Sequence, residues 1–297
     1  MFNLIGLGEI LWDLLPSGRQ LGGAPANFAY HANALGATGT IISRVGTDQN
    51  GADILVRVRQ LGLSSDLIQI DPEVPTGTVS VELGSDGQPR YIIHENVAWD
   101  RIVAKKETLA AAAHADAICF GTLAQRSDRS RASIHDILSH SKRDALRILD
   151  VNLRQSFYSA DVISQSLGAA NILKINDAEL LILAKLLGCT GNAESQMVQI
   201  AKSYNLRLVA LTRGAHGSLL IANGQRSEHA GIPTAVADTI GAGDSFTAAM
   251  ALGILAGWDL DKINEHANRI ASFVASRPGA TPDHPPELRE PFTSIHR

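Results

Sequence analysis

The sequence predicts an α/β fold in which a doubly wound, mostly parallel sheet forms the middle of three layers and carries a small β lid. Short apolar runs alternate along the chain with longer stretches in which apolar residues recur at helical spacing. Strand followed by helix, repeated, is typical of a parallel sheet covered on both faces by helices. The alternation of strand and helix is interrupted by one pair of extended segments, which predicts the lid. The runs expected to be buried strands are 41–42, 117–120, 147–150, 172–175 and 208–211.

Two later stretches have apolar residues at positions i, i+3, i+4 and i+7, which predicts helices. In sheets of this kind, ligands bind beyond the carboxyl ends of the strands. We therefore expect the functional residues in the loops between these strands and helices. The residues with helical spacing are Leu180, Leu183, Ala184 and Leu187 in one stretch, and Phe246, Ala249, Met250 and Gly253 in the other.

The predicted lid begins with a hairpin. Apolar and polar residues alternate over 78–83, the turn signal Gly-Ser-Asp-Gly follows at 84–87, and a second extended stretch covers 90–94. Extended segments near 10–22 would complete the lid, so we expect a single domain over 1–297 with a lid built from about 10–22 and 75–98. Such a lid could exclude water from a transfer reaction, and the alternative is a hairpin that only decorates the sheet edge.

Composition excludes several classes of protein. The chain has 297 residues, 45% hydrophobic and 19% charged, with a formal net charge of −4 and no basic stripe, so no nucleic-acid partner is expected. No apolar run approaches a membrane span and the first residues lack a signal-peptide pattern, so neither a membrane partner nor secretion is expected. Cys119 and Cys189 are expected to be buried free thiols of a cytoplasmic protein, and a disulfide between them is the alternative.

The strongest chemical signal is the glycine-rich segment 238–246, which runs into the second predicted helix. Gly241, Ala242 and Gly243 let the backbone approach a ligand closely, and the first turn of the helix presents unpaired N–H groups to an anion. Asp244 could accept the proton of an attacking hydroxyl while the γ-phosphate of ATP lies on those amides. The alternative is a glycine-rich turn whose aspartate only complements the helix dipole.

Two segments resemble motifs of one family. The segment 238–246 resembles the C-terminal signature of the ribokinase (PfkB-type) carbohydrate kinases, and 22–29 resembles their N-terminal Gly-Gly-x-x-x-Asn sugar motif. The resemblance extends from about Leu4 to Ala280. It implies a ribokinase-like three-layer α/β/α fold, ATP and Mg²⁺ as cofactors, a small sugar as substrate, and Asp244 with the amides of 241–243 as the catalytic group.

The resemblance also implies substrate contacts. Asp13, Gly22, Gly23 and Asn27 look like residues that hold sugar hydroxyls. From the residues alone, Gly22 and Gly23 could equally form a plain turn and Asn27 a polar position early in a helix. Arg154 closes a segment, 150–154, that resembles the Asp-x-Asn-x-Arg motif of fructokinases and 2-keto-3-deoxygluconate kinases. It could clamp a phosphate or an acidic substrate, or remain a solvated surface arginine.

Further residues resemble the family's nucleotide and ion sites. Asn176 and Glu179 match its Asn-x-x-Glu motif, which implies contact with Mg²⁺ through water, although the same spacing is a helix capping box. Asp238 would supply an oxygen to the K⁺ that some members bind. The residues that would contact the nucleotide are Asn176, Thr212, Gly214, Gly217, Gly243 and Asn268.

The motifs are most similar to those of the fructokinase branch, so fructose is the expected substrate. The alternatives are 2-keto-3-deoxygluconate or another sugar of the family, and a non-catalytic sugar- or nucleotide-binding protein. Trp99, just after the hairpin, could lie against the sugar or belong to the core. A dinucleotide-dependent oxidoreductase is rejected, because Gly6-Leu7-Gly8 lacks the third glycine of that fingerprint. The exposed edges of a lid also predict a homodimer that pairs through it.

Overall fold

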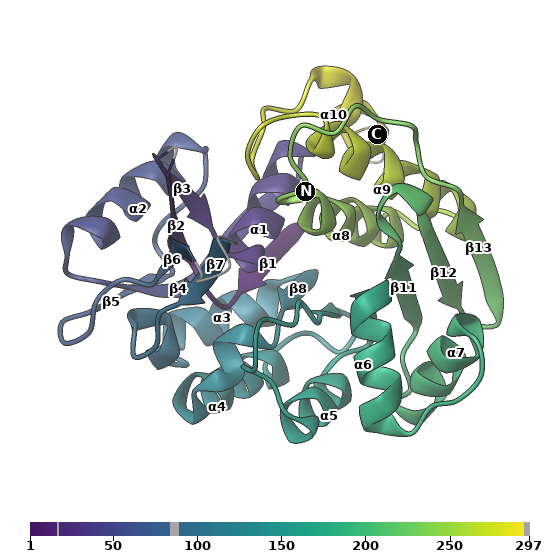
Figure 1. The fold of residues 1–297 in the computed structure, drawn as a ribbon, viewed down its shortest axis with the longest axis horizontal. Helices are drawn as coiled ribbons and strands as arrows, with labels where there is room; N and C mark the ends of the chain where they lie inside the picture. The colour runs from purple at the N-terminus through teal and green to yellow at the C-terminus, as the bar shows by residue number, and fades with distance from the viewer. Residues whose placement is uncertain (17, 84–88, 294–297) are drawn as a thin grey trace.

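The computed structural model describes residues 1–16, 18–83 and 89–293, and within them a nine-stranded sheet runs in the order β13-β12-β11-β10-β9-β8-β1-β4-β5 (Figure 1). Neighbours from β5 to β11 are parallel, whereas β12 and β13 are antiparallel. The five expected strands are confirmed. The strands are β1 (Asn3–Leu7), β4 (Thr38–Gly46), β5 (Ile68–Asp71), β8 (Ala117–Phe120), β9 (Leu146–Asp150), β10 (Ile172–Asn176), β11 (Leu208–Thr212), β12 (Ser218–Ala222) and β13 (Gln225–His229).

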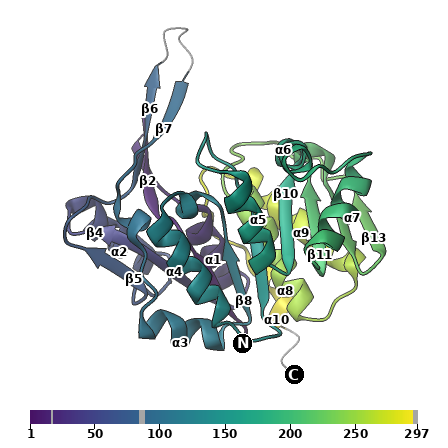
Figure 2. The same ribbon diagram turned by 90° about the horizontal axis from the view of Figure 1, so that it is seen from below.

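Helices cover both faces of this sheet, as Figure 2 shows. Along β8, Ile118 and Phe120 pack into one apolar core and Ala117 and Cys119 into another, because successive strand side chains point to opposite faces. The first core lies under α3 (Lys106–His114), α4 (Asp128–Ser139), α5 (Ala160–Ala169), α6 (Asp177–Leu187) and α7 (Ala193–Ser203). The second core lies under α1 (Ala24–Ala34), α8 (Ala242–Leu255), α9 (Leu260–Ala275) and α10 (Pro286–Thr293). The remaining helix, α2 (Gln49–Gln60), packs on a third apolar cluster beside β4.

The lid is a separate four-stranded sheet in the order β3-β2-β6-β7. Its strands are β2 (Leu11–Leu15), β3 (Gly18–Gly22), β6 (Thr78–Leu83) and β7 (Pro89–Ile93). The predicted hairpin is therefore present, with Val79 opposite Ile93 in an antiparallel register, and it projects from the body in Figure 2. The predicted turn at 84–87 lies outside the described residues. Val79 and Ile93 belong to the first core, so the base of the lid is packed against the body.

Trp99 follows the lid and is fully buried, with the Arg126 guanidinium 3.9 Å above its ring. It belongs to the core and does not line the cavity described below, so the second of its two interpretations holds. Both cysteines are free thiols, as expected, but only Cys119 is buried and Cys189 is half-buried. Among the helices of the described residues, none combines the length and apolar character needed to cross a bilayer.

A buried histidine pair joins the first helix to the segment after α9. His31 Nε2 lies 3.0 Å from the Ala280 carbonyl oxygen, which can only accept, so this nitrogen carries a proton and donates. His31 Nδ1 must then accept from His284 Nε2, 3.0 Å away. Both rings are neutral in this arrangement. Burial lowers the pKa of His31 to about 3, helped by His284 and opposed by the Ala280 carbonyl, and burial lowers the pKa of His284 to about 4.

These lowered pKa values predict how stability depends on pH. An unfolded histidine titrates near pH 6.5, so below that pH the unfolded chain binds protons that the folded pair excludes. The contribution of His284 is complete above about pH 6.5 and is lost as the pH falls towards about 4, to a total of roughly 2 to 3 kcal/mol. His284→Gln, measured by urea unfolding from pH 7.5 to 4.5, should lose less stability on acidification than the native chain. The exposed His216→Gln is the control, and equal pH slopes in the two variants would contradict the prediction.

Candidate active site

A cavity of about 880 Å³ lies between the lid, the carboxyl ends of β9–β11 and the start of α8. Every site residue predicted from the sequence lines it, except Glu179 and Asp238. The lid, the first helix and the glycine-rich segment thus meet at one place although they are far apart in the chain. The predicted residues along the cavity are Asp13, Gly22, Gly23, Asn27, Arg154, Asn176, Thr212, Gly214, Gly217, Gly241, Ala242, Gly243, Asp244 and Asn268.

The start of α8 forms the middle of the cavity wall. Gly241 is the N-cap, with a left-handed φ of 79°, and a Cβ built there would lie 2.4 Å from the Ala280 carbonyl oxygen. Only glycine therefore fits this position. The amide of Ala242 donates to the Thr239 carbonyl oxygen at 3.3 Å, so the anion would be bound mainly by the amides of Gly243 and Asp244, which follow in the first turn. First-turn amides have no acceptor within their own helix, so this turn can bind an anion.

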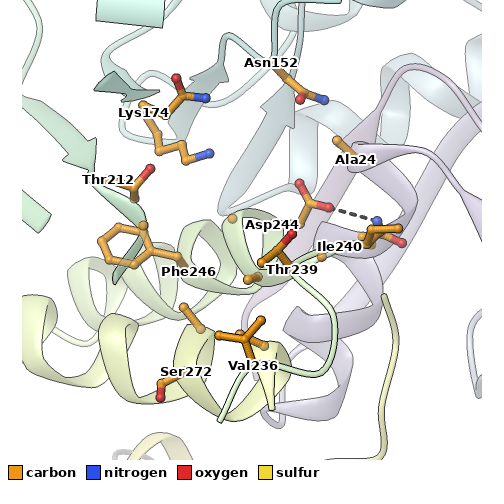
Figure 3. A pocket seen from close by; sticks show the side chains of 18 of the residues that line it. Ala24, Asn152, Lys174, Thr212, Val236, Thr239, Ile240, Asp244, Phe246 and Ser272 are labelled. Carbon is orange, nitrogen blue, oxygen red and sulfur yellow. Dashed lines mark hydrogen bonds between the residues drawn. The ribbon is translucent and has the colours of Figure 1, made fainter. Parts of the chain in front are cut away.

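Asp244 is held by the first helix. Asn27 Nδ2 on α1 donates to Asp244 Oδ2 at 2.8 Å, drawn as the dashed line in Figure 3. Burial raises the pKa of Asp244 to about 6, and the Asp150 carboxylate adds to this, whereas the Asn27 hydrogen bond, Lys174 and Arg154 lower it. A carboxylate with this pKa is ionised at neutral pH and basic enough to accept a proton. The arrangement fits a general base in a fixed orientation.

Asp13 and the two glycines meet at the lid end of the cavity. A Cβ on Gly22 would lie 2.3 Å from Asp13 Oδ2, and one on Gly23, where φ is 112°, would lie 2.4 Å from the Glu9 carbonyl oxygen. The two glycines leave room for these oxygens, a close approach that a plain turn would not require. Burial raises the pKa of Asp13 to about 6 against the opposing charge of Arg154. The Arg154 side chain is exposed and lines the cavity.

Glu9, which follows β1, was not predicted as a site residue. Its side chain lines the cavity and is 2% exposed, and its Oε2 atom is buried without a hydrogen-bond partner in the described part of the chain. Burial raises the pKa of Glu9 to about 7, against the backbone N–H groups of Glu9 and Ala24 and the charge of Arg154, while Asp244 raises it further. A carboxylate directly after the first buried strand lies on the ligand edge of the sheet, which is the signal that could have identified it.

Asn176 and Glu179 form the capping box of α6. Asn176 Oδ1 accepts from the Glu179 amide at 3.0 Å, and Glu179 Oε2 accepts from the Asn176 amide at 2.9 Å. Glu179 Oε1 accepts from the Leu153 amide at 3.0 Å. Both carboxylate oxygens of Glu179 thus accept backbone N–H groups, and the side chain is 5% exposed. Helix capping accounts for these contacts, so any contact of Glu179 with a cation would have to pass through water.

The far end of the cavity is the expected nucleotide end. Thr212 Oγ1 donates to the Ile175 carbonyl at 3.3 Å, and Gly214 and Gly217 bound the short turn that follows β11. The side-chain nitrogen of Asn268 already donates to Ser218 Oγ at 2.6 Å and to the Asn264 carbonyl at 2.8 Å. Nδ2 is thus engaged within the protein. The apolar residues of this end include Val236, Ala271 and Ala275, whose surface suits the face of a purine ring.

Asp238 lies outside the cavity wall. Its Oδ1 accepts from the Ile240 amide at 3.0 Å, and its Oδ2 accepts from the Gly279 amide at 3.1 Å. The carboxylate therefore holds the glycine-rich segment against the turn after α9. Its expected part in a monovalent-ion site stays a prediction.

The comparison with known families decides the class of this protein. Residues 18–287 match the family model described as pfkB family carbohydrate kinase. The chain belongs to the pfkB family of carbohydrate kinases. Family membership makes it a sugar kinase that uses ATP, and the predicted ribokinase-like fold is confirmed.

Individual relatives agree with this assignment. PH1459 of Pyrococcus horikoshii, named an uncharacterized sugar kinase, is 28% identical over 94% of this chain and 92% of its own length. A fructokinase of Escherichia coli is 27% identical over 84% of this chain and 83% of its own. The crystal structure of PH1459 in complex with ATP superposes with a TM-score of 0.79 at 26% identity, covering 95% of this chain and 94% of that one.

Proposed function

We propose that this family member transfers the γ-phosphate of ATP to a hydroxyl group of fructose. The observation that carries the proposal is the position of Asp244, in the first turn of α8 and bound by Asn27. A sugar hydroxyl placed beside Asp244 would face a γ-phosphate on the first-turn amides, which is the in-line arrangement that phosphoryl transfer requires. Asp13, Gly23 and Asn27 would orient the sugar, and Asp244 would accept its proton. The E. coli relative, named fructokinase, supports the choice of sugar.

Magnesium would enter with the nucleotide. Both Glu179 oxygens accept backbone N–H groups and Asn176 Oδ1 caps the helix, so these residues fit a hydrated ion through its water molecules and not by direct ligation. The ion would neutralise phosphate charge during transfer. A K⁺ ion near Asp238 would likewise depend on backbone carbonyl oxygens, because the carboxylate already accepts two N–H groups.

A sugar acid such as 2-keto-3-deoxygluconate is the second candidate substrate, and Arg154 is the observation that favours it. Its side chain lines the cavity close enough to Asp13 and Glu9 to lower the pKa of both carboxyl groups. A guanidinium at the sugar end can bind a substrate carboxylate bidentately. Fructose has no such group, so the two substrates would depend on Arg154 to different degrees.

The test is ADP release with Mg-ATP and a panel of fructose, 2-keto-3-deoxygluconate, ribose and adenosine. We expect fructose to give the highest kcat/KM. Arg154→Met should lower kcat/KM for the sugar acid by roughly 10- to 100-fold, the strength of a charge-assisted pair, and affect fructose much less. Exposed Arg129→Met is the matched control. Preference for the acid would replace the proposed sugar, and binding of ATP with no turnover on any sugar would indicate a non-catalytic binding protein.

We also propose a cytoplasmic location and a homodimer. Consumption of ATP fits the expected cytoplasmic location. The lid ends in two edge strands, β3 and β7, and exposes Leu14 and Tyr91, which fits the expected homodimer through the lid.

A further inference from the structure

The cavity contains a cation that the proposed chemistry has not used. Among its described lining residues, only Arg154 and Lys174 carry a positive charge. Arg154 acts on Asp13 and Glu9 at the lid end, and on Asp244 less than Lys174 does. Lys174 lies on β10, beside the start of α8, where the phosphates are expected. A transferring phosphoryl group spreads negative charge over three oxygens, and a fixed ammonium group beside them stabilises it.

The position of the Lys174 ammonium is set by its neighbours. Lys174 is 7% exposed, and its Nζ lies 3.1 Å from Asp150 Oδ1. A Cβ built on Gly243 would lie 3.0 Å from the same Nζ, so the ammonium lies directly against the first turn of α8. In Figure 3 the side chain points from β10 towards the end of α8 that carries Asp244. The amides proposed to bind the γ-phosphate and this ammonium therefore share one part of the cavity.

Asp150 holds the ammonium in place and leaves it able to bind a ligand. Asp150 Oδ2 accepts from Thr247 Oγ1 on α8 at 2.9 Å, so the carboxylate is fixed between two strands and the helix. An ammonium group has three N–H donors, and the Asp150 salt bridge uses one of them. Burial lowers the pKa of Lys174, but the carboxylates of Asp150, Glu179 and Asp244 raise it more, so the net shift is upward and the group stays charged.

We propose that Lys174 is a catalytic residue that donates hydrogen bonds to the γ-phosphate during its transfer. The alternative is a buried ion pair that serves folding only. Such pairs contribute little net stability, because desolvation offsets most of the attraction. The pair also ties β9 and β10 to α8, but the placement of its ammonium on the cavity wall, against Gly243, suits a role in catalysis. The inference rests on the phosphoryl transfer proposed above.

The test compares two nucleotides that differ by the γ-phosphate. In Lys174→Met, the Kd of a non-hydrolysable ATP analogue with Mg²⁺ should rise about tenfold or more, while the Kd of ADP changes by less than about threefold. On the native chain's best sugar, kcat should fall roughly 100-fold with the sugar KM nearly unchanged. Lys174→Arg, which keeps the charge, should recover part of both losses. Exposed Lys185→Met on α6 is the control.

Equal weakening of ADP and the analogue, or unchanged kcat in a folded Lys174→Met, would overturn the proposal. Circular dichroism and thermal unfolding establish that each variant folds, and Lys174→Gln replaces the Met variant if that one does not. The native chain is assayed on the sugar panel first. If it transfers no phosphate, the proposed function fails independently, and the two binding constants still decide whether Lys174 contacts the γ-phosphate.

Discussion

Asp244→Asn is expected to lower kcat by roughly 1000-fold on the preferred sugar, because an amide cannot accept the proton of the attacking hydroxyl. Binding of Mg-ATP should change by less than about threefold, since the first-turn backbone of α8 is retained. Measurement of kcat by ADP release, together with calorimetric titration of a non-hydrolysable ATP analogue, separates the two effects. Turnover close to that of the native chain would contradict the role of Asp244 as the base.

The same assignment fixes the sign of the pH dependence. The base works when ionised, and the pKa of Asp244 is raised to about 6, so kcat/KM of the native chain should fall as the pH drops through about 6. In Asp244→Asn the decline should be shallower, because only Asp13 and Glu9, whose pKa values are also raised into this range, still contribute to it. Asn27 is part of the same effect, because its hydrogen bond to Asp244 favours the ionised form.

Gly241→Ala is expected to lower kcat roughly 100-fold, because the new Cβ would lie 2.4 Å from the Ala280 carbonyl oxygen and force the first turn of α8 out of position. Gly279→Ala is a closely matched control. Its φ of 78° is nearly the 79° of Gly241, but a Cβ there has open space around it. Both variants should therefore carry a backbone strain of about 1 kcal/mol, but only Gly241→Ala adds the clash with Ala280 and should lose activity. Equal activity in the two variants would show that the contact with Ala280 does not position the turn.

Much of this architecture could be predicted from local pattern. The run 172–175 and the spacing that starts at Leu180 predict β10 and α6, because a buried strand and a helix each impose their own period on apolar residues. β13 escaped prediction because its residues, Gln225 to His229, are all polar, and an edge strand needs little apolar surface. β5 escaped prediction because its polar residues Gln69 and Asp71 are buried while Ile70 is exposed, which is the reverse of the usual pattern.

Some of the site residues could likewise be predicted from local pattern, and others could not. Asp244 and its glycines are contiguous in sequence, so the pattern alone indicated an anion site. Lys174 could not be recognised, because its significance comes from Asp150 on a neighbouring strand. The parallel register of β9 and β10 places these two residues side by side, and no local spacing encodes that register. The position of Glu9 after β1 indicates the ligand edge, but its neighbours Ala24 and Asp244 come from other parts of the chain and are not encoded by local spacing.

The contact between Ala280 and the start of α8 has a consequence for biosynthesis. The Asn27–Asp244 hydrogen bond joins residues 217 positions apart, and the turn that carries Asp244 rests on Ala280, whose carbonyl also accepts from His31. A chain emerging from the ribosome can pair β1 with β4 early, since both strands lie in its first quarter. It cannot assemble the catalytic turn until residues close to the C-terminus have been translated. Incomplete translation products therefore lack the assembled catalytic turn and cannot consume ATP in this way.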